Sequence, residues 1–254
     1  IVLIEGLAKD YGFKVAKYAV QADKMQDQWS QWLNVRQDNP DWMVMWGWGA
    51  MNPTAVKEAA KVGYPMDKFI GVWWSGSEDD ARPAGPGGKG YLTLNFTATG
   101  ADFPAVQDIV KHVFDKGNSS VKEKSKIGEV NYNKGVYNSV LMAEAIRTAQ
   151  KITGKKVINA ADMRLGLEAL EISEARFKEI GLGGFAAPVK VTCDDHSGAH
   201  AVYLQQWNGT KWVKASDWIA PMKDKVRPLL DKDAADYTGK NAPWPVRTEP
   251  CGGR

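Results

Sequence analysis

Tryptophan is the residue type with the most chemistry to offer in this sequence, since 11 of the 254 residues are Trp. Five of these tryptophans lie close together in the N-terminal part of the chain: Trp29, Trp32, Trp42, Trp46 and Trp48. An indole has a large apolar face and a single N–H donor, so it suits either a protein core or the wall of a ligand pocket. The pattern therefore predicts a core, an aromatic-lined binding site, or both.

The two cysteines, Cys193 and Cys251, both lie in polar, loop-like surroundings. This placement suits a disulfide that fixes a C-terminal tail in an oxidising compartment. Two unpaired thiols in a cytosolic protein are the alternative. A metal site built from Cys193, Asp195, His196 and His200 is a weaker interpretation, because one Cys and two His without a paired motif make a poor zinc site. We predict neither a metal nor a cofactor.

Enzymatic signatures do not emerge from the sequence. It contains no Gly-x-Ser-x-Gly elbow, no phosphate-binding P-loop and no Gly-x-Gly-x-x-Gly after a strand. A triad around Cys193 would take His196 or His200 as its base, and adjacency in sequence rarely gives the required geometry. We therefore expect a protein that is not an enzyme.

Charge and hydropathy exclude two classes of partner. The formal net charge is only +3, and basic residues are interspersed with acidic ones, so no nucleic-acid-binding stripe is present. No apolar run reaches the roughly 18 residues that a membrane span needs. We expect no nucleic acid and no direct membrane span.

Helices and strands alternate along the first part of the chain. Apolar spacing predicts helices over residues 1–10, 24–37 and 53–62, and strands over 13–20, 42–48, 69–74 and 89–96. The run 42–48 is of the kind buried on both faces of a parallel sheet. Repeated strand–helix–strand units predict the α/β class, with a parallel sheet flanked by helices.

In such sheets ligands bind beyond the carboxyl ends of the strands. This rule selects the residues that follow three predicted strands: Trp48 and Gly49, Trp73 and Trp74, and Asn95 and Phe96. We expect function there first.

The second half of the chain is mainly helical before it returns to strands. Helices are predicted over 102–116, 133–153, 160–170, 173–180 and 221–237, and strands over 189–192 and 201–207. Asn208-Gly209 is a strong hairpin signal that leads into Trp212.

The order of these elements resembles the type I periplasmic solute-binding proteins of branched-chain amino-acid ABC transporters. The likeness covers nearly the whole chain and rests on the order and spacing of several strings. They are Asn39-Pro40-Asp41, Trp46-Gly47-Trp48-Gly49, Val62-Gly63-Tyr64, residues 69–74, residues 87–91, the helix string 137–149, residues 192–196 and residues 203–212.

The resemblance implies two Rossmann-like lobes with parallel sheets, of which the N-terminal lobe is incomplete in this chain. Residues 1–95 with 207–254 would form the C-terminal lobe. Residues 96–206 would form the C-terminal part of the other lobe together with the hinge crossings. The usual N-terminal segment would be absent, so we expect the chain alone to bind poorly.

The resemblance also implies a function: capture of a small molecule by hinge closure, followed by delivery to an ABC transporter permease of the inner membrane. The protein would be an exported, periplasmic monomer whose signal peptide is not present in this chain. The alternative is a ligand-sensing module of an amide- or amino-acid-responsive regulator or receptor, which would signal without delivering solute.

The ligand wall implied by the resemblance contains Trp48, where relatives also place an aromatic ring. At the position of Trp73, relatives tend to place an acid that meets the ligand ammonium, so an α-amino acid is disfavoured here. We expect an aromatic or aliphatic carboxylate between Trp48 and Trp73, near Gly49 and Trp74, with polar contacts from Asn95, Tyr132 and Asn133. For Trp42, Trp46 and Trp74, core packing is the favoured interpretation.

Overall fold

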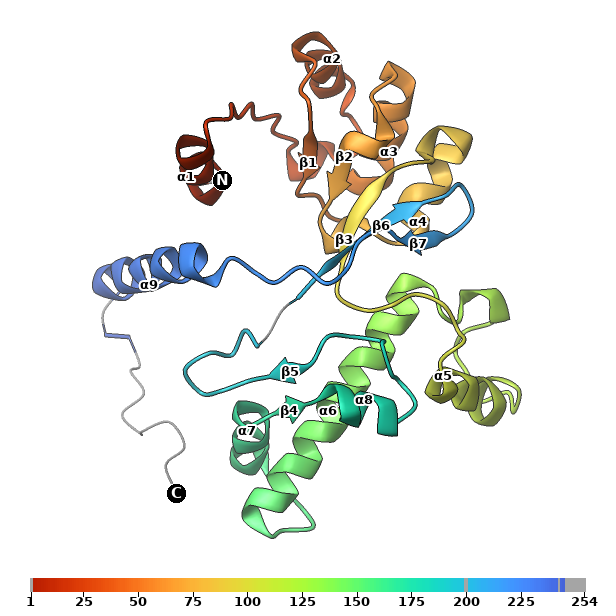
Figure 1. Cartoon of the computed structure of the whole chain (residues 1–254), viewed down its shortest axis with the longest axis vertical. Helices are drawn as coiled ribbons and strands as arrows, with labels where there is room; N and C mark the ends of the chain where they lie inside the picture. The colour runs from red at the N-terminus through yellow and green to blue at the C-terminus, as the bar shows by residue number, and fades with distance from the viewer. Residues whose placement is uncertain (1, 199–200, 242, 245–254) are drawn as a thin grey trace.

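The computed structural model describes residues 2–198, 201–241 and 243–244. Figure 1 shows two bodies of packed elements, with the segment after β3 leading from one to the other. Each body has its own hydrophobic core, one centred on a five-stranded sheet and the other on a long helix. The α/β class with a mainly parallel central sheet is confirmed.

The central sheet has the strand order β1-β2-β3-β6-β7. Its strands are β1 (Met43–Met45), β2 (Phe69–Gly71), β3 (Leu92–Asn95), β6 (Tyr203–Trp207) and β7 (Trp212–Lys214). The first three run parallel, as predicted, whereas β6 and β7 form an antiparallel hairpin at the edge. The hairpin turn is closed by Asn208, whose N–H donates to the carbonyl of Lys211.

Helices cover one face of this sheet. They are α2 (Trp29–Asp38), α3 (Met51–Val62) and the short α4 (Glu78–Ala81). Aromatic rings form the contact between the layers: the Trp32 and Phe69 centroids lie 5.2 Å apart, and those of Phe69 and Tyr91 lie 4.9 Å apart. All three rings are buried, so the helices and the sheet pack densely against each other here.

The second body is built around α6 (Val130–Thr153), which Gly154 ends in a left-handed conformation. The other elements are α5 (Pro104–Ile109) with its π-helical extension (Val110–Phe114), α7 (Ala160–Glu168), α8 (Glu174–Glu179), β4 (Glu171–Ile172) and β5 (Val189–Lys190). Gly166 lets α7 approach α6 closely, because a Cβ there would collide with the backbone of Ala145. Phe177 and Phe185 complete the core beneath the two helices.

Helices α1 (Val2–Tyr11) and α9 (Lys223–Lys240) lie side by side away from both cores (Figure 1). Lys225 donates from Nζ to a carboxylate oxygen of Asp10 at 2.8 Å, and neither helix has a buried residue. The first helix ends within one residue of its predicted end, and Gly12 follows it with a positive φ of 75°.

One strand prediction was wrong and another was wrong in part. Residues 13–20 form no strand, because none of the described strands lies beside them to supply ladder hydrogen bonds. The 42–48 run is not buried on both faces: Val44 is 54% exposed, and only the central residues 43–45 form a strand. β1 is the edge of the sheet, and among the described elements no helix covers its outer face.

The hairpin also bears on the predicted lobe boundary. Residues 203–206, which we placed with residues 96–202, pair with β3 and so belong to the central sheet. Residues 199 and 200, just before β6, lie outside the described residues.

Candidate functional site

A hollow of about 650 Å³ lies where β1 and β2 end, facing the start of α6. Four of the predicted ligand residues line it together: Trp48, Gly49, Trp73 and Trp74. Gly49 takes a positive φ of 57°, which a residue without a Cβ adopts at no steric cost. That turn leads the chain from the strand end into α3.

Two exposed indoles, Trp48 and Trp74, and the half-buried indole of Trp73 give the hollow its aromatic character. Trp73 and Trp74 lie in a 3-10 turn with their ring centroids 5.4 Å apart, and the rings of Trp46 and Trp73 lie 6.3 Å apart. Our preference for a core role at Trp42, Trp46 and Trp74 was wrong, because these side chains are 55%, 68% and 57% exposed. Trp42 and Trp46 flank an uncovered edge strand, and Trp74 follows a strand end.

A buried polar network holds the Trp73–Trp74 turn. The amide of Asn52 donates to the carbonyl of Trp74 at 2.8 Å, while the hydroxyl of Ser75 donates to Asn52 Oδ1 at 3.1 Å. Tyr91 donates its hydroxyl to the carbonyl of Ser75 at 3.0 Å. Gly47 completes the set, since a Cβ there would clash with Asn52. These hydrogen bonds therefore fix the backbone that carries the two indoles.

The other wall of the hollow comes from α6 and the residue after β3. It consists of Phe96, Asn131, Lys134 and Asn138. Of these only Phe96 lay in a segment that the strand-end rule selected. The spacing of 131, 134 and 138 (i, i+3, i+7) places their side chains on one helix face, so a polar stripe at this spacing was the signal that could have identified them.

Lys134 is the charged member of this wall. Its Nζ donates to the carbonyl of Trp73 at 2.6 Å and lies 5.4 Å from the centroid of the Phe96 ring. Burial lowers the pKa of Lys134 to about 8, although the carboxylates of Asp80 and Glu78 act in the opposite direction. An ammonium whose charge is poorly hydrated thus stands beside the indoles.

The remaining predicted ligand residues do not line the hollow. Asn95 is buried, its amide donates to Gln205, and its Oδ1 accepts from the backbone N–H of Phe96. Asn133 is buried and donates to the carbonyls of Ala98 and Gly100. Both hold the crossing after β3 in place.

Tyr132 packs partly buried against the core of the second body, and burial raises the pKa of its hydroxyl.

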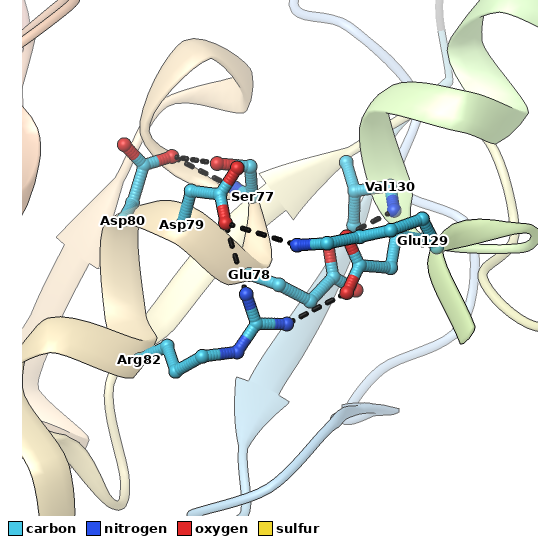
Figure 2. Close-up of polar contacts among 8 residues, drawn as sticks. Ser77, Glu78, Asp79, Asp80, Arg82, Glu129 and Val130 are labelled. Atoms are coloured by element: carbon cyan, nitrogen blue, oxygen red, sulfur yellow. Dashed lines mark hydrogen bonds and ion pairs between the residues drawn. The ribbon is translucent and has the colours of Figure 1, made fainter. Parts of the chain in front are cut away.

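A charged contact joins the two bodies between α4 and the start of α6 (Figure 2). Glu78 accepts from the backbone N–H of Val130 at 3.1 Å, and the guanidinium of Arg82 donates to Glu129 at 2.6 Å and to Asp79 at 2.9 Å. We call Glu78, Asp79, Arg82, Glu129 and Val130 the α4–α6 contact. A carboxylate at a helix N-terminus is stabilised by the free N–H groups there.

Burial raises the pKa of two acids near this contact. It raises the pKa of Glu78, against the lowering effect of its backbone hydrogen bonds. It also raises the pKa of Asp80, whose Oδ2 accepts from the N–H and the hydroxyl of Ser77 at 2.8 and 2.7 Å.

A second hollow, of about 530 Å³, lies between the α4–α6 contact and the β6–β7 hairpin. Its charged lining includes Glu78, Arg82 and Glu129, which are already engaged with one another or with the start of α6. Its lining also includes Trp212, Trp218 and Lys214, but only three of its 18 lining residues are aromatic, against four of eight in the first hollow, which is therefore the better candidate for binding an organic molecule.

The cysteine and histidine candidates lie elsewhere. Cys193 is not a free thiol, but Cys251 and His200 lie outside the described residues, so the predicted disulfide remains a prediction. Nε2 of His196 lies 3.7 Å from Oε1 of Glu168. The carboxylate of Asp195 forms an ion pair with Nζ of Lys223. Across the described ranges, no cluster of three or more metal-ligating side chains occurs, and no helix is long and apolar enough to cross a membrane.

Comparison with known proteins gives consistent matches. A family model described as periplasmic binding protein matches residues 3–211. A crystal structure described as an ABC transporter permease from the Pseudomonas fluorescens group is 39% identical, with a TM-score of 0.89 over 97% of this chain.

Two more distant structures share the fold. One is a branched-chain amino acid ABC transporter from Thermus thermophilus with bound valine, at 17% identity and a TM-score of 0.67 over 89% of this chain. The other is a solute-binding protein of an ABC transporter from R. palustris in complex with benzoate, at 18% identity and a TM-score of 0.58 over 86% of this chain.

This chain spans 59%, 57% and 56% of the length of these three structures. A search of curated proteins finds no match.

Proposed function

Since this chain belongs to the periplasmic binding protein family, as the resemblance to branched-chain amino-acid receptors predicted, we propose that it serves in the solute-binding component of an ABC importer. Its ligand is a small carboxylate with an aromatic or aliphatic body, which is favoured over an α-amino acid. The binding site is the hollow lined by Trp48, Trp73 and Trp74. In this role the protein makes and breaks no bond.

The observation that carries the proposal is the composition of the hollow. Among the residues that the structure describes, its lining has three indoles and a phenyl ring but no acidic side chain. An α-amino acid needs a carboxylate or several carbonyl oxygens near its ammonium, because a desolvated charge without a partner costs several kcal/mol, about 3–5 when one partner of a buried pair is removed. A flat or apolar acid brings no ammonium and can stack on the indoles.

The distant relatives are compatible with either ligand class, since one holds valine and another holds benzoate. The difference between them must therefore lie in the side chains of the site. Trp73 occupies the position where the amino-acid receptors tend to place an acid. This supports a carboxylate such as benzoate, and not an amino acid, as the ligand of this chain.

Hinge closure is the proposed mechanism. The central sheet with residues 1–95 and the segment from β6 onward form one lobe, and residues 96–198 contribute to the other. A ligand that contacts both the Trp73–Trp74 turn and α6 stabilises the closed arrangement by its higher affinity for that state. The closed form is then read by a permease of the inner membrane, with the binding protein acting as a periplasmic monomer.

A disulfide between Cys193 and Cys251 forms part of the proposal. It suits the oxidising periplasm and would hold the C-terminal tail against the loop that follows β5. Mass spectrometry of a non-reduced digest would detect the linked peptides directly.

A thermal-shift screen of the full-length protein tests the function. The panel contains benzoate, 4-hydroxybenzoate, cyclohexanecarboxylate, benzamide, L-leucine and L-valine. A ligand at about 100 times its dissociation constant stabilises by about 2.7 kcal/mol, so a true ligand raises the melting temperature clearly. We expect shifts with the acids, whereas a strong shift with leucine or valine alone would contradict the proposal.

A further inference from the structure

Lys134 lies near the N-terminus of α6, and its ammonium has N–H donors left for a ligand. An ammonium has three N–H donors, and one of them is taken by the carbonyl of Trp73 at 2.6 Å. Within the part of the chain that the structure describes, Lys134 forms no ion pair. The nearby acids Glu78 and Asp80 influence its charge but do not line the hollow.

Its surroundings are unusual for a lysine. The ammonium lies over the ring of Phe96 and lines the same hollow as Trp48, Trp73 and Trp74. Lysines on protein surfaces are normally fully hydrated, and burying the charge without an anion is costly. The pKa of Lys134, lowered to about 8 by burial, reflects that cost.

The geometry points to Lys134 as the residue that recognises the ligand carboxylate, through an ion pair made while the body of the acid stacks on the indoles. This inference rests on the proposed function and deepens it. Asn131 and Asn138 lie on the same face of α6 and offer amide N–H donors to the second carboxylate oxygen.

The position of Lys134 also links recognition to the hinge. Lys134 belongs to α6 of one body, while its present acceptor, Trp73, belongs to the sheet body. An acid seated between the indoles and Lys134 would therefore contact both bodies through one functional group, as a ligand that stabilises closure must.

Calorimetric titration of the full-length protein with benzoate and benzamide tests this assignment. The two probes share the ring and differ in charge. A hydrogen bond to a charged group is worth about 1.5–3 kcal/mol, so Lys134→Gln should weaken benzoate binding about 10- to 100-fold. Benzamide binding should stay within about threefold in the same variant, which also shows that the variant is folded. Lys134→Arg keeps the positive charge and should retain the preference for benzoate.

Equal benzoate affinity in the wild type and in Lys134→Gln would overturn the role of Lys134 and leave the proposed function standing. Loss of both probes in Lys134→Gln, with both retained in Lys134→Arg, would also overturn it, because the lysine would then serve the site as a whole. Failure of the wild type to bind any acid of the panel would refute the proposed function together with this inference.

Discussion

Trp73 serves the hollow in two separable ways. Its ring forms part of the aromatic wall, and its backbone carbonyl accepts the hydrogen bond of Lys134. A side-chain substitution removes the first role and leaves the second in place, so the contribution of the indole can be measured alone.

We predict that Trp73→Ala weakens benzoate binding about tenfold or more, because an aromatic pair contributes about 0.5–1.5 kcal/mol in addition to the apolar area it buries. Trp42→Ala is the control: this indole is 55% exposed, whereas Trp73 is half-buried, and it does not line the hollow. Calorimetry on both variants is the measurement, and equal losses would show that the site lies elsewhere.

The pH dependence of binding should follow the charge of Lys134. Its pKa of about 8 means that the ammonium is present below that pH and is lost above it. Benzoate stays ionised throughout, so its affinity should fall about tenfold between about pH 7 and about pH 9. The charged groups that act on Lys134 are Glu78 and Asp80 of α4.

Two controls separate Lys134 from these carboxyls. Benzamide affinity should stay flat over the same range, and Lys134→Arg should bind benzoate equally at both pH values, since arginine remains charged. A fall of the same size in Lys134→Arg would assign the titration to another group.

For single residues, the sequence predicted which aromatic side chains line the hollow better than it predicted which polar side chains do. The strand-end rule selected Trp48, Gly49, Trp73 and Trp74, and these four residues line one hollow. It could not distinguish Asn133 from Lys134, which are adjacent on α6 but face different surroundings. Only the helix phase, set by packing against the β3 crossing, decides which of them lines the hollow.

Among the secondary-structure elements, the α4–α6 contact is a polar junction of the two bodies, in addition to the hydrogen bond from Lys134 to Trp73. Glu78 is only 7% exposed and its carboxylate accepts from the N–H of Val130 at the first turn of α6. Asp79, next to it, is an exposed acid that pairs with Arg82 and Lys126.

We predict that Glu78→Ala lowers the free energy of unfolding by about 1–3 kcal/mol, the cost of leaving a buried donor without its acceptor. Asp79→Ala should change it by less than about 1 kcal/mol, as exposed ion pairs contribute little. Glu78→Gln keeps an acceptor and should lie between the two. Urea denaturation followed by fluorescence is suitable, and equal effects for the two alanine variants would contradict this account of the contact.

Elements show the limit of local patterns most clearly. Residues 13–20 have the composition of a strand, yet they form none, because a strand also needs a neighbour to complete its hydrogen bonds. The run 42–48 gave the position of β1 but not its burial, since exposure of Val44 depends on which face a helix covers. By contrast, the helix ends predicted at residues 10 and 153 and the hairpin at Asn208 depend on local geometry, such as the positive φ of Gly12 and Gly154, and these predictions were correct to within a residue.

For the molecule as a whole, the division into two bodies is what gives the hollow its proposed function. The crossing after β3 connects two bodies that each have a core, and Val130 at the start of α6 is the α6 residue that packs into the core of the sheet body, so relative movement would disturb the apolar packing at that residue and leave most of both cores intact. Trp48, Trp73 and Trp74 follow strands of the sheet body, whereas α6 belongs to the other body (Figure 1).

We predict that benzoate decreases the radius of gyration of the full-length protein in small-angle X-ray scattering, because the ligand contacts both bodies. Benzamide, which lacks the charge for Lys134, should give a smaller decrease at equal occupancy. An unchanged radius at saturating benzoate would contradict hinge closure and leave the ligand assignment intact.

The most direct measurement is a crystal structure of the full-length protein with 4-bromobenzoate, in which anomalous scattering locates the bromine. We predict the ring between Trp48 and Trp73, with the carboxylate within hydrogen-bond distance of Nζ of Lys134. Bromine in the charged hollow beside Arg82 and Lys214, or a carboxylate turned away from Lys134, would contradict the proposed site.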